Sequence, residues 1–151
     1  MCYVSRMNME TIKVRSFTLA FAAAWARLEK RLDHSLGAIR GISLAEYRLL
    51  QALGDAPSSQ ASRVDLAQAV GLTPSGVTRA LRPMEKLGIV ATVKSKRDAR
   101  LAIAGLTPAG RELLGDAAGV VEDTMKTLLQ RSPKTLAQLD ELTGILDEIG
   151  H

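Results

Sequence analysis

Hydrophobic residues recur every three or four positions along most of the chain, and this spacing predicts a mainly helical protein. The longest such run extends from about Glu10 to Ile39 without a proline, and Gly41 ends it. Trp25 broadens an apolar stripe along this predicted helix. The stripe consists of Phe17, Phe21, Ala24, Leu28 and Leu32. Residues 1–9 carry no such pattern, and we predict a disordered leader there.

A capping pattern marks the start of the second predicted helix. Ser43 and Glu46 have the spacing of a capping box, in which each side chain hydrogen-bonds to the other residue's backbone N–H. The helix should extend to about Leu53. Its inward positions are Leu44, Tyr47, Leu50 and Leu53. Residues 54–61 are rich in turn-forming residues, and we interpret them as a linker.

Two more helices are predicted after residue 107. Thr107 followed by Pro108 is a cap-then-proline signal for a helix that reaches about Arg131. Ser132 and Pro133 repeat the signal and predict a single last helix. Both helices carry an apolar stripe at helical spacing. The stripes are Leu113, Leu114, Ala117, Val121, Met125, Leu128 and Leu129 in the first helix, and Leu136, Leu139, Leu142, Leu146 and Ile149 in the second.

Between these regions the sequence predicts two short helices joined by a tight turn. Ser62 with Asp65 resembles a capping box, and Gly71 can adopt the left-handed conformation that ends a helix. Thr73 then caps a second helix, with Pro74 at its first position. The inward residues of the first helix should be Val64, Leu66, Ala67 and Val70. This order is the helix-turn-helix pattern, whose second helix enters a major groove of DNA.

The second of these helices has two chemically different faces. Val77, Leu81 and Met84 recur at intervals of three and four, so one face is predicted to be buried. The opposite face carries hydroxyl groups and cations: Ser75, Thr78, Arg79 and Arg82. After Gly88 the period becomes extended, and two short apolar runs flank the polar segment 94–100. This pattern predicts a β-hairpin beside the second helix, which is a wing.

The positive charge of the chain is concentrated in this winged unit. The whole chain has a net charge of +4. Residues 62–100 contain eight Lys or Arg and three acidic residues, whereas the remaining residues contain twelve and thirteen. Four of the basic residues lie in the wing: Lys94, Lys96, Arg97 and Arg100. Bound phosphates would explain this distribution, although a solvated basic face would give the same charges.

Five motifs in this region resemble those of the MarR (multiple antibiotic resistance regulator) family of winged helix-turn-helix repressors. They correspond, in order and spacing, to the family's LA helix, recognition helix, recognition-helix exit, wing DxR and start of the next helix. The residues that carry these five motifs lie in six stretches: Asp65-Leu66-Ala67, Gly71-Leu72-Thr73, Ser75-Gly76-Val77-Thr78-Arg79, Met84-Glu85-Lys86-Leu87-Gly88-Ile89-Val90, Asp98-Ala99-Arg100 and Leu106-Thr107-Pro108-Ala109-Gly110. The resemblance covers most of the chain and leaves out the first nine residues.

The resemblance implies a mainly α fold with a winged helix-turn-helix lobe, a small β-hairpin wing and dimerisation helices at both ends. We assign residues 41–107 to the lobe, and residues 10–40 and 108–151 to the dimerisation region. The apolar stripes favour this division, because a winged unit cannot cover all of them and exposed apolar area is unfavourable. A stripe covered within one chain is the alternative.

In function, the resemblance implies a homodimer that binds a pseudopalindromic operator in double-stranded DNA and regulates transcription as a repressor. It also implies a small aromatic or anionic effector, bound between the dimer helices and the DNA-binding lobe, that releases the DNA. Candidate pocket residues are Trp25, Tyr47 and Arg48. Core or surface packing is an alternative explanation for each.

The expected DNA-binding side chains divide into three roles. Base edges would be read by Ser75, Thr78 and Arg79, since arginine can donate two hydrogen bonds to guanine. Phosphates would be bound by Arg82, Lys94, Lys96 and Arg97. By resemblance to the family's wing, Arg100 would enter the minor groove and Asp98 would orient it. A surface ion pair is the alternative for each arginine.

The chain departs from the family pattern at two positions. Pro83 lies inside the predicted recognition helix, where it removes a backbone hydrogen bond and favours a kink. Ala91 stands where relatives usually have arginine, so one phosphate or ion-pair contact of the family would be missing.

Other classes of protein receive little support from the sequence. His34 and His151 are far apart, and no cluster of His, Cys or carboxylates has metal-ligand spacing, so we expect neither an enzyme nor a cofactor. Cys2, the only cysteine, precedes the first predicted helix, which argues against the peroxide-sensing role of some relatives. No apolar run approaches the length of a membrane span, and we expect a cytoplasmic protein. The remaining alternative is a winged-helix module that binds protein rather than DNA.

Overall fold

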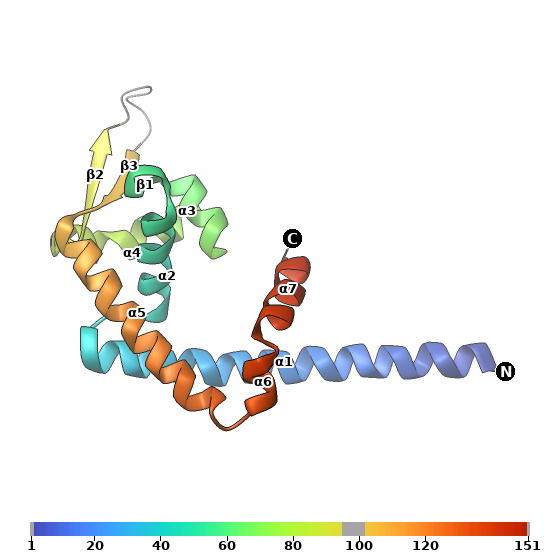
Figure 1. Cartoon of the computed structure of the whole chain (residues 1–151). Helices are drawn as coiled ribbons and strands as arrows, with labels where there is room; N and C mark the ends of the chain where they lie inside the picture. The colour runs from blue at the N-terminus through green and yellow to red at the C-terminus, as the bar shows by residue number, and fades with distance from the viewer. Residues whose placement is uncertain (1, 95–101, 151) are drawn as a thin grey trace.

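A long helix, α1 (Cys2–Arg40), carries the winged lobe at its C-terminal end and projects away from it at its N-terminal end (Figure 1). The computed structural model describes residues 2–94 and 102–150. The lobe contains α2 (Leu44–Asp55), α3 (Arg63–Val70), α4 (Pro74–Lys86) and a small sheet. Helix α5 (Pro108–Leu129) leads out of the lobe and crosses α1, and α6 (Pro133–Ala137) and α7 (Leu139–Gly150) follow it. The fold is mainly α with a small wing, as predicted.

The sheet has three antiparallel strands in the order β1-β3-β2. Strands β2 (Val90–Lys94) and β3 (Ala102–Leu106) pair from Val90↔Leu106 to Lys94↔Ala102, which confirms the predicted hairpin. Strand β1 (Gln60–Ser62) pairs with β3 and lies in the segment for which the sequence predicted only a linker. A single 3₁₀ turn (Pro57–Ser59) precedes it. Three residues are too few to show the alternation by which a strand is recognised.

The first helix is longer than predicted. It begins at Cys2, so residues 2–9 are helical, and the prediction of a disordered leader there is wrong. The chain contains no proline or glycine before Gly37, so nothing in the local sequence stops the helix at its N-terminal end. Helix α2 begins as predicted, with a complete capping box between Ser43 and Glu46.

The predicted single last helix is two helices. Ser132 makes no side-chain hydrogen bond to the backbone of α6, and its hydroxyl contacts that of Thr135 at 2.6 Å instead. The backbone leaves helical geometry at Gln138 (φ −114°, ψ 15°), between α6 and α7. Gln138 is neither glycine nor proline, so the sequence carries no local signal for this break.

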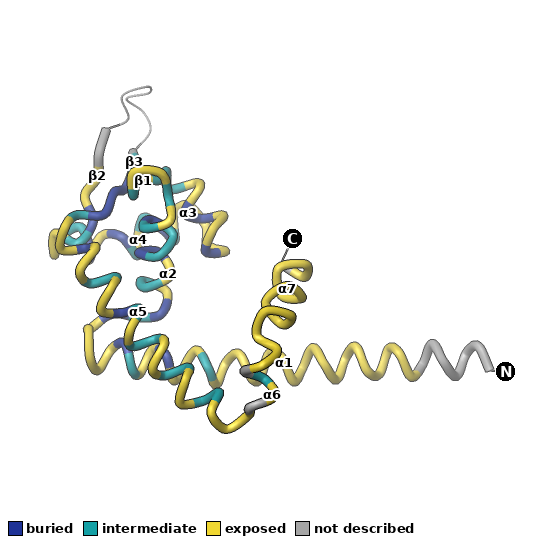
Figure 2. Tube along the Cα trace, viewed as in Figure 1, coloured by how far each residue is buried: buried dark blue, intermediate teal, exposed yellow. Residues whose placement is uncertain are grey.

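The core lies inside the lobe and between the lobe and the two helices that join it. The largest fully buried side chains belong to the lobe and to the end of α1: Leu36, Leu49, Leu50, Leu53, Leu66, Val77, Leu81, Met84 and Val90. By contrast, the N-terminal part of α1 and all of α7 that the structure describes are exposed (Figure 2). Within the described residues, none of the helices combines the length and apolarity that a membrane span requires.

Candidate nucleic-acid interface

The helix-turn-helix is built from local backbone signals, all of which were predicted. The hydroxyl of Ser62 accepts a hydrogen bond from the N–H of Asp65 and starts α3. Gly71 ends that helix in the left-handed region (φ 69°), which favours a residue without a side chain. The hydroxyl of Thr73 accepts a hydrogen bond from the N–H of Gly76, with Pro74 at the first position of α4.

One predicted core residue of α3 lies outside the core. Val64 is 52% exposed, whereas the inner face of this short helix consists of Leu66, Ala67 and Val70. Val64 lies in the first turn of an eight-residue helix, so helical spacing alone did not show where the neighbouring core ends.

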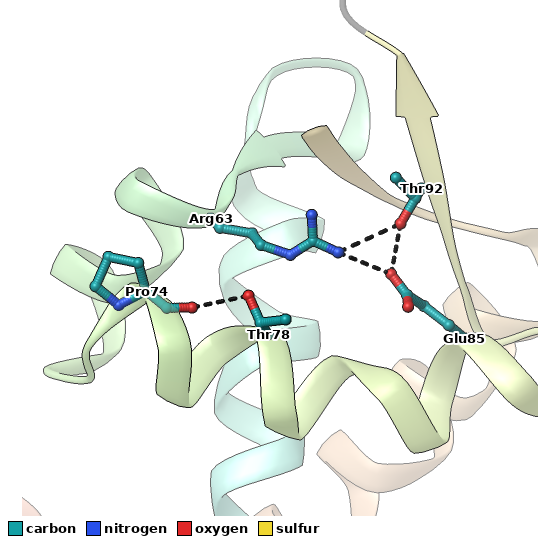
Figure 3. A network of polar contacts seen from close by, with 5 residues as sticks. All are labelled: Arg63, Pro74, Thr78, Glu85 and Thr92. Atoms are coloured by element: carbon teal, nitrogen blue, oxygen red, sulfur yellow. Dashed lines mark hydrogen bonds and ion pairs between the residues drawn. The ribbon is translucent and has the colours of Figure 1, made fainter. Parts of the chain in front are cut away.

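Helix α4 presents the predicted polar face to solvent. Val77, Leu81 and Met84 are buried under it. Ser75, Arg79 and Arg82 are exposed, and Thr78 is half-buried. These four outer residues line one shallow recess of about 260 Å³. The hydroxyl of Thr78 donates a hydrogen bond to the carbonyl oxygen of Pro74 at 2.9 Å (Figure 3), and its oxygen can still accept one from a ligand.

Helix α4 continues through Pro83 to Lys86 as one segment. Pro83 is exposed and lies after the three side chains expected to read bases. The N–H of Leu87 donates to the carbonyl oxygen of Pro83 at 3.1 Å, so the regular helical hydrogen bonding continues past the proline. The missing N–H of the proline therefore does not end the recognition helix.

A polar cluster joins α3, α4 and the wing (Figure 3). The Nη2 atom of Arg63 lies 3.2 Å from Oε1 of Glu85 and 3.4 Å from Oγ1 of Thr92, and the Thr92 hydroxyl donates to the same carboxylate oxygen. The side chains of Arg63 and Glu85 are only 20% and 27% exposed. The cluster connects the first turn of α3 to the end of α4 and to β2. The cluster has no local signal in the sequence, because Arg63 and Glu85 are 22 residues apart.

The wing residues can be placed only in part. Lys94 is the last residue of β2. The predicted contacts of Lys96, Arg97, Asp98 and Arg100 lie outside the described residues. Ala91 is exposed on β2, opposite Gly105 of β3.

The N-terminus of α5 is fixed against the exit of α4. The Thr107 hydroxyl donates to the carbonyl oxygen of Gly88 at 2.6 Å and to that of Ile89 at 3.0 Å. A Cβ atom on Gly110 would lie 2.2 Å from the Ile89 carbonyl oxygen, so only glycine fits there. These contacts connect α5 firmly to the winged lobe.

The three expected pocket residues do not come together. Tyr47 and Arg48 line a pocket of about 490 Å³ between α2 and α3, whereas Trp25 does not line it and is 42% exposed on α1. Burial raises the pKa of the Tyr47 phenol, and the negative charges of Glu122 and Asp55 raise it further.

The comparisons with known proteins agree with this geometry. Residues 40–101 match the family model described as MarR family. This segment of the chain is similar to the MarR family. At the level of sequence alone, no curated protein is significantly similar to it. The MarR-family segment contains the helix-turn-helix and the first strand of the wing.

Solved structures extend the similarity to most of the chain. The transcriptional regulator BldR from Sulfolobus solfataricus has 24% identity and a TM-score of 0.79, over 90% of this chain and 96% of BldR. Sco3205, a MarR family regulator from Streptomyces coelicolor in complex with DNA, has 26% identity and a TM-score of 0.76, over 89% and 86%. The repressor CouR bound to a 23-mer DNA duplex has 22% identity and a TM-score of 0.76, over 87% and 90%.

The family and the fold are those of DNA-binding transcriptional regulators rather than of enzymes. Among the described side chains, no three His, Cys, Asp or Glu residues come together in a group that could bind a metal ion. Asp33, adjacent to His34 in the sequence, has a structural role. Its carboxylate accepts a hydrogen bond from the N–H of Leu44 at 2.6 Å and caps α2.

Proposed function

We propose that this protein represses transcription as a homodimer whose two winged lobes bind one pseudopalindromic operator. The observation that carries the proposal is the outer face of α4, where hydroxyl groups and arginines lie side by side above a buried apolar face. A helix with this chemistry, held at the surface by the preceding helix, is suited to the major groove.

On this proposal, Arg79 donates two hydrogen bonds to a guanine, and Ser75 and Thr78 contact neighbouring bases or phosphates. Arg82 lies further along the same face and binds a phosphate. In the wing, Lys94, Lys96 and Arg97 bind phosphates, Arg100 enters the minor groove and Asp98 orients it. The Arg63–Glu85 pair supports these contacts, because it holds the recognition helix and the wing in one relative position.

Exposed apolar side chains on the terminal helices support the proposal of a homodimer. The dimer would form through residues 10–40 and 108–151. Phe17, Phe21 and Trp25 are 58%, 47% and 42% exposed along one stripe of α1. The apolar stripe of α7 is exposed as well: Leu139, Leu142, Ile145, Leu146 and Ile149. Covering such stripes is favourable by ~25 cal/mol per Å² of apolar area. Helix α7 contains four acidic residues and no basic ones, whereas α1 is net positive, so the charges suit a pairing of α7 with α1 of a second copy.

The related structures support DNA as the partner and a small molecule as the regulator. Sco3205 and CouR were solved with DNA, and the DNA binding of Bordetella bronchiseptica BpsR is regulated by 6-hydroxynicotinic acid. BpsR has 18% identity and a TM-score of 0.75, over 87% of this chain and 91% of BpsR. We propose an aromatic or anionic effector that changes the spacing of the two lobes and releases the operator.

A gel-shift titration with the DNA upstream of the protein's own gene tests the proposal. Binding should weaken steeply as salt rises, because phosphate contacts release counterions. Arg79→Ala should cost roughly 1–3 kcal/mol of binding free energy. Arg131→Ala is the matched control, because Arg131 is an exposed arginine beyond the end of α5. Binding that is indifferent both to salt and to Arg79→Ala would instead favour a protein-binding module.

A further inference from the structure

A hydroxyl group on the wing and an arginine on α3 share one carboxylate oxygen at the end of α4 (Figure 3). Oε1 of Glu85 accepts a hydrogen bond from the Thr92 hydroxyl and lies 3.2 Å from Nη2 of Arg63. The same Nη2 atom lies 3.4 Å from the hydroxyl oxygen of Thr92. The three side chains therefore contact one another in a closed triangle. Each contact involves a charged group, which makes it stronger than a contact between neutral groups.

This polar cluster fixes the edge strand of the wing to the recognition helix. In the described sheet, whose order is β1-β3-β2, strand β3 is paired on both sides and β2 on one. Val90, at the start of β2, is buried in the core of the lobe. Thr92 lies two residues further toward the tip, on the same face of the strand, and is exposed. Its hydrogen bond therefore joins β2 to α4 at a point outside the core.

The guanidinium group of Arg63 is directed into the protein. Its side chain is 20% exposed, and the buried Nε atom has no hydrogen-bond partner among the described residues. Nη2 faces the carboxylate of Glu85, which compensates the charge of the arginine. This geometry suits a residue that positions other groups better than one that binds a DNA phosphate.

We infer that Thr92 and Arg63 are positioning residues, which determine whether the wing engages the minor groove without touching the DNA themselves. Glu85 lies on the helix that would read bases, and Thr92 lies on the wing, so the cluster sets the distance between the two DNA-binding elements. Without the cluster, α4 would still enter the major groove, but the wing would not be held beside it. This inference rests on the proposed function.

A fixed wing affects both affinity and sequence preference. Ordering a segment upon binding costs conformational entropy, so a wing that is already in position contributes more to affinity. Minor-groove width depends on the DNA sequence, and a cation in a narrow groove reads that width. The cluster should therefore determine the preference for base pairs that flank the segment read by α4.

Two chemical footprints on the DNA upstream of the protein's own gene test the inference, because they report different grooves. Dimethyl sulfate methylates guanine N7 in the major groove. Hydroxyl radicals attack the deoxyribose from the minor groove. The wild type should protect both. With saturating Thr92→Val, which replaces the hydroxyl by a methyl group, N7 should stay protected and the flanking hydroxyl-radical protection should be lost. The Kd should rise roughly tenfold, the cost of one lost groove contact.

Three further variants control the experiment. Thr92→Ser keeps the hydroxyl group and should behave as the wild type. Arg63→Met should match Thr92→Val, because it removes the cation that holds the Glu85 carboxylate. Thr127→Val is the matched control, since Thr127 is an exposed threonine whose hydroxyl donates to the carbonyl oxygen of Asp123 within α5. It should leave both footprints unchanged.

Three results would overturn the inference. Equal loss of both footprints in Thr92→Val would indicate a general defect in folding or binding. An unchanged hydroxyl-radical footprint would show that the wing does not need the cluster. A loss of affinity in Arg63→Met but not in Thr92→Val would make Arg63 a phosphate ligand. A wild type that leaves no footprint at all would instead refute the proposed function, and this inference with it, so the two failures are distinguishable.

Discussion

The winged lobe buries most of its large apolar side chains, whereas the terminal helices leave many of theirs exposed. In the lobe, three short helices and a three-stranded sheet converge, and side chains such as Leu50, Val77 and Leu81 are completely buried. In the N-terminal part of α1 and in α7, large apolar side chains remain exposed, up to 66% at Leu19. The lobe is complete within one chain. The terminal helices have the composition of a core, and we propose that a second chain completes it.

This contrast predicts which property of the protein a mutation in each region should alter. A defect in the lobe should reduce the free energy of unfolding, since the lobe holds most of the core. A defect on an exposed stripe should reduce association, and with it the simultaneous binding of two half-sites.

The largest effect is expected from a charge on the exposed stripe of α1. Phe21 stacks on Phe17, with ring centroids 6.1 Å apart. Phe21→Glu would place a carboxylate in the proposed dimer interface, where it cannot be solvated. We expect a monomer and a loss of operator affinity of roughly a hundredfold or more, because the second half-site no longer adds to binding. Sedimentation and gel shift measure the two effects.

The matched control is Ala23→Glu, which introduces the same charge about 200° further round the same helix. It should remain dimeric. A dimeric Phe21→Glu, or a monomeric Ala23→Glu, would contradict the assignment of the stripe to the interface.

Next in size is Gly110→Ala, at the junction of the lobe and α5. The added Cβ would lie 2.2 Å from the carbonyl oxygen of Ile89, so backbone must move. We expect a loss of roughly 1–3 kcal/mol in the free energy of unfolding, the usual cost of overpacking. Urea denaturation measures it. Gly115 is on the same helix with nothing within 4 Å of its added Cβ, so Gly115→Ala should stabilise the protein slightly. Equal effects at the two glycines would contradict the close contact.

The features that were predictable from sequence are those fixed by neighbouring residues. Ser43, Thr73 and Thr107 start their helices as predicted, because the partners of a cap lie within three residues. The helical spacing of the apolar residues predicted which face of α4 is buried. The change of period after Gly88 predicted the hairpin of β2 and β3. The division into a lobe and a dimerisation region stays a prediction.

The features that were missed depend on distant partners. Strand β1 exists because β3 lies beside it, and the Arg63–Glu85 pair joins residues far apart in sequence. Trp25, Tyr47 and Arg48 were named as pocket candidates because of the helices on which they lie, but only Tyr47 and Arg48 line the same pocket. The break at Gln138 has no local signal at all.

A smaller effect is expected at the polar cluster that joins α3, α4 and β2. Arg63→Met keeps the length of the side chain but leaves Glu85 with only the Thr92 hydroxyl. Hydrogen bonds to charged groups contribute ~1.5–3 kcal/mol. The pair is partly solvated, and the buried Nε of Arg63 has no hydrogen-bond partner in the described structure, so we expect a loss near the lower value. Urea denaturation measures it, and Arg111→Met at an exposed position is the control. Equal stabilities would show that the cluster contributes nothing.

The smallest effect is expected at Tyr47. Its hydroxyl lies 3.4 Å from Gln51, a long hydrogen bond, so Tyr47→Phe should change neutral-pH stability by less than ~1 kcal/mol. The pKa of Tyr47 is raised in the folded state, so folding favours the protonated phenol. The wild type should therefore lose stability as the pH rises above about 10, the unfolded pKa, and the Phe variant should lose less. Parallel pH profiles of thermal unfolding would contradict the raised pKa.

The most direct measurement is the mass in solution of the full-length protein, alone and with an operator duplex, by analytical ultracentrifugation. If the terminal helices hold two lobes together, the free protein should have twice the chain mass of 16.2 kDa. Each duplex should then bind two chains. A free protein of 16.2 kDa that binds its duplex as a single chain would contradict the account.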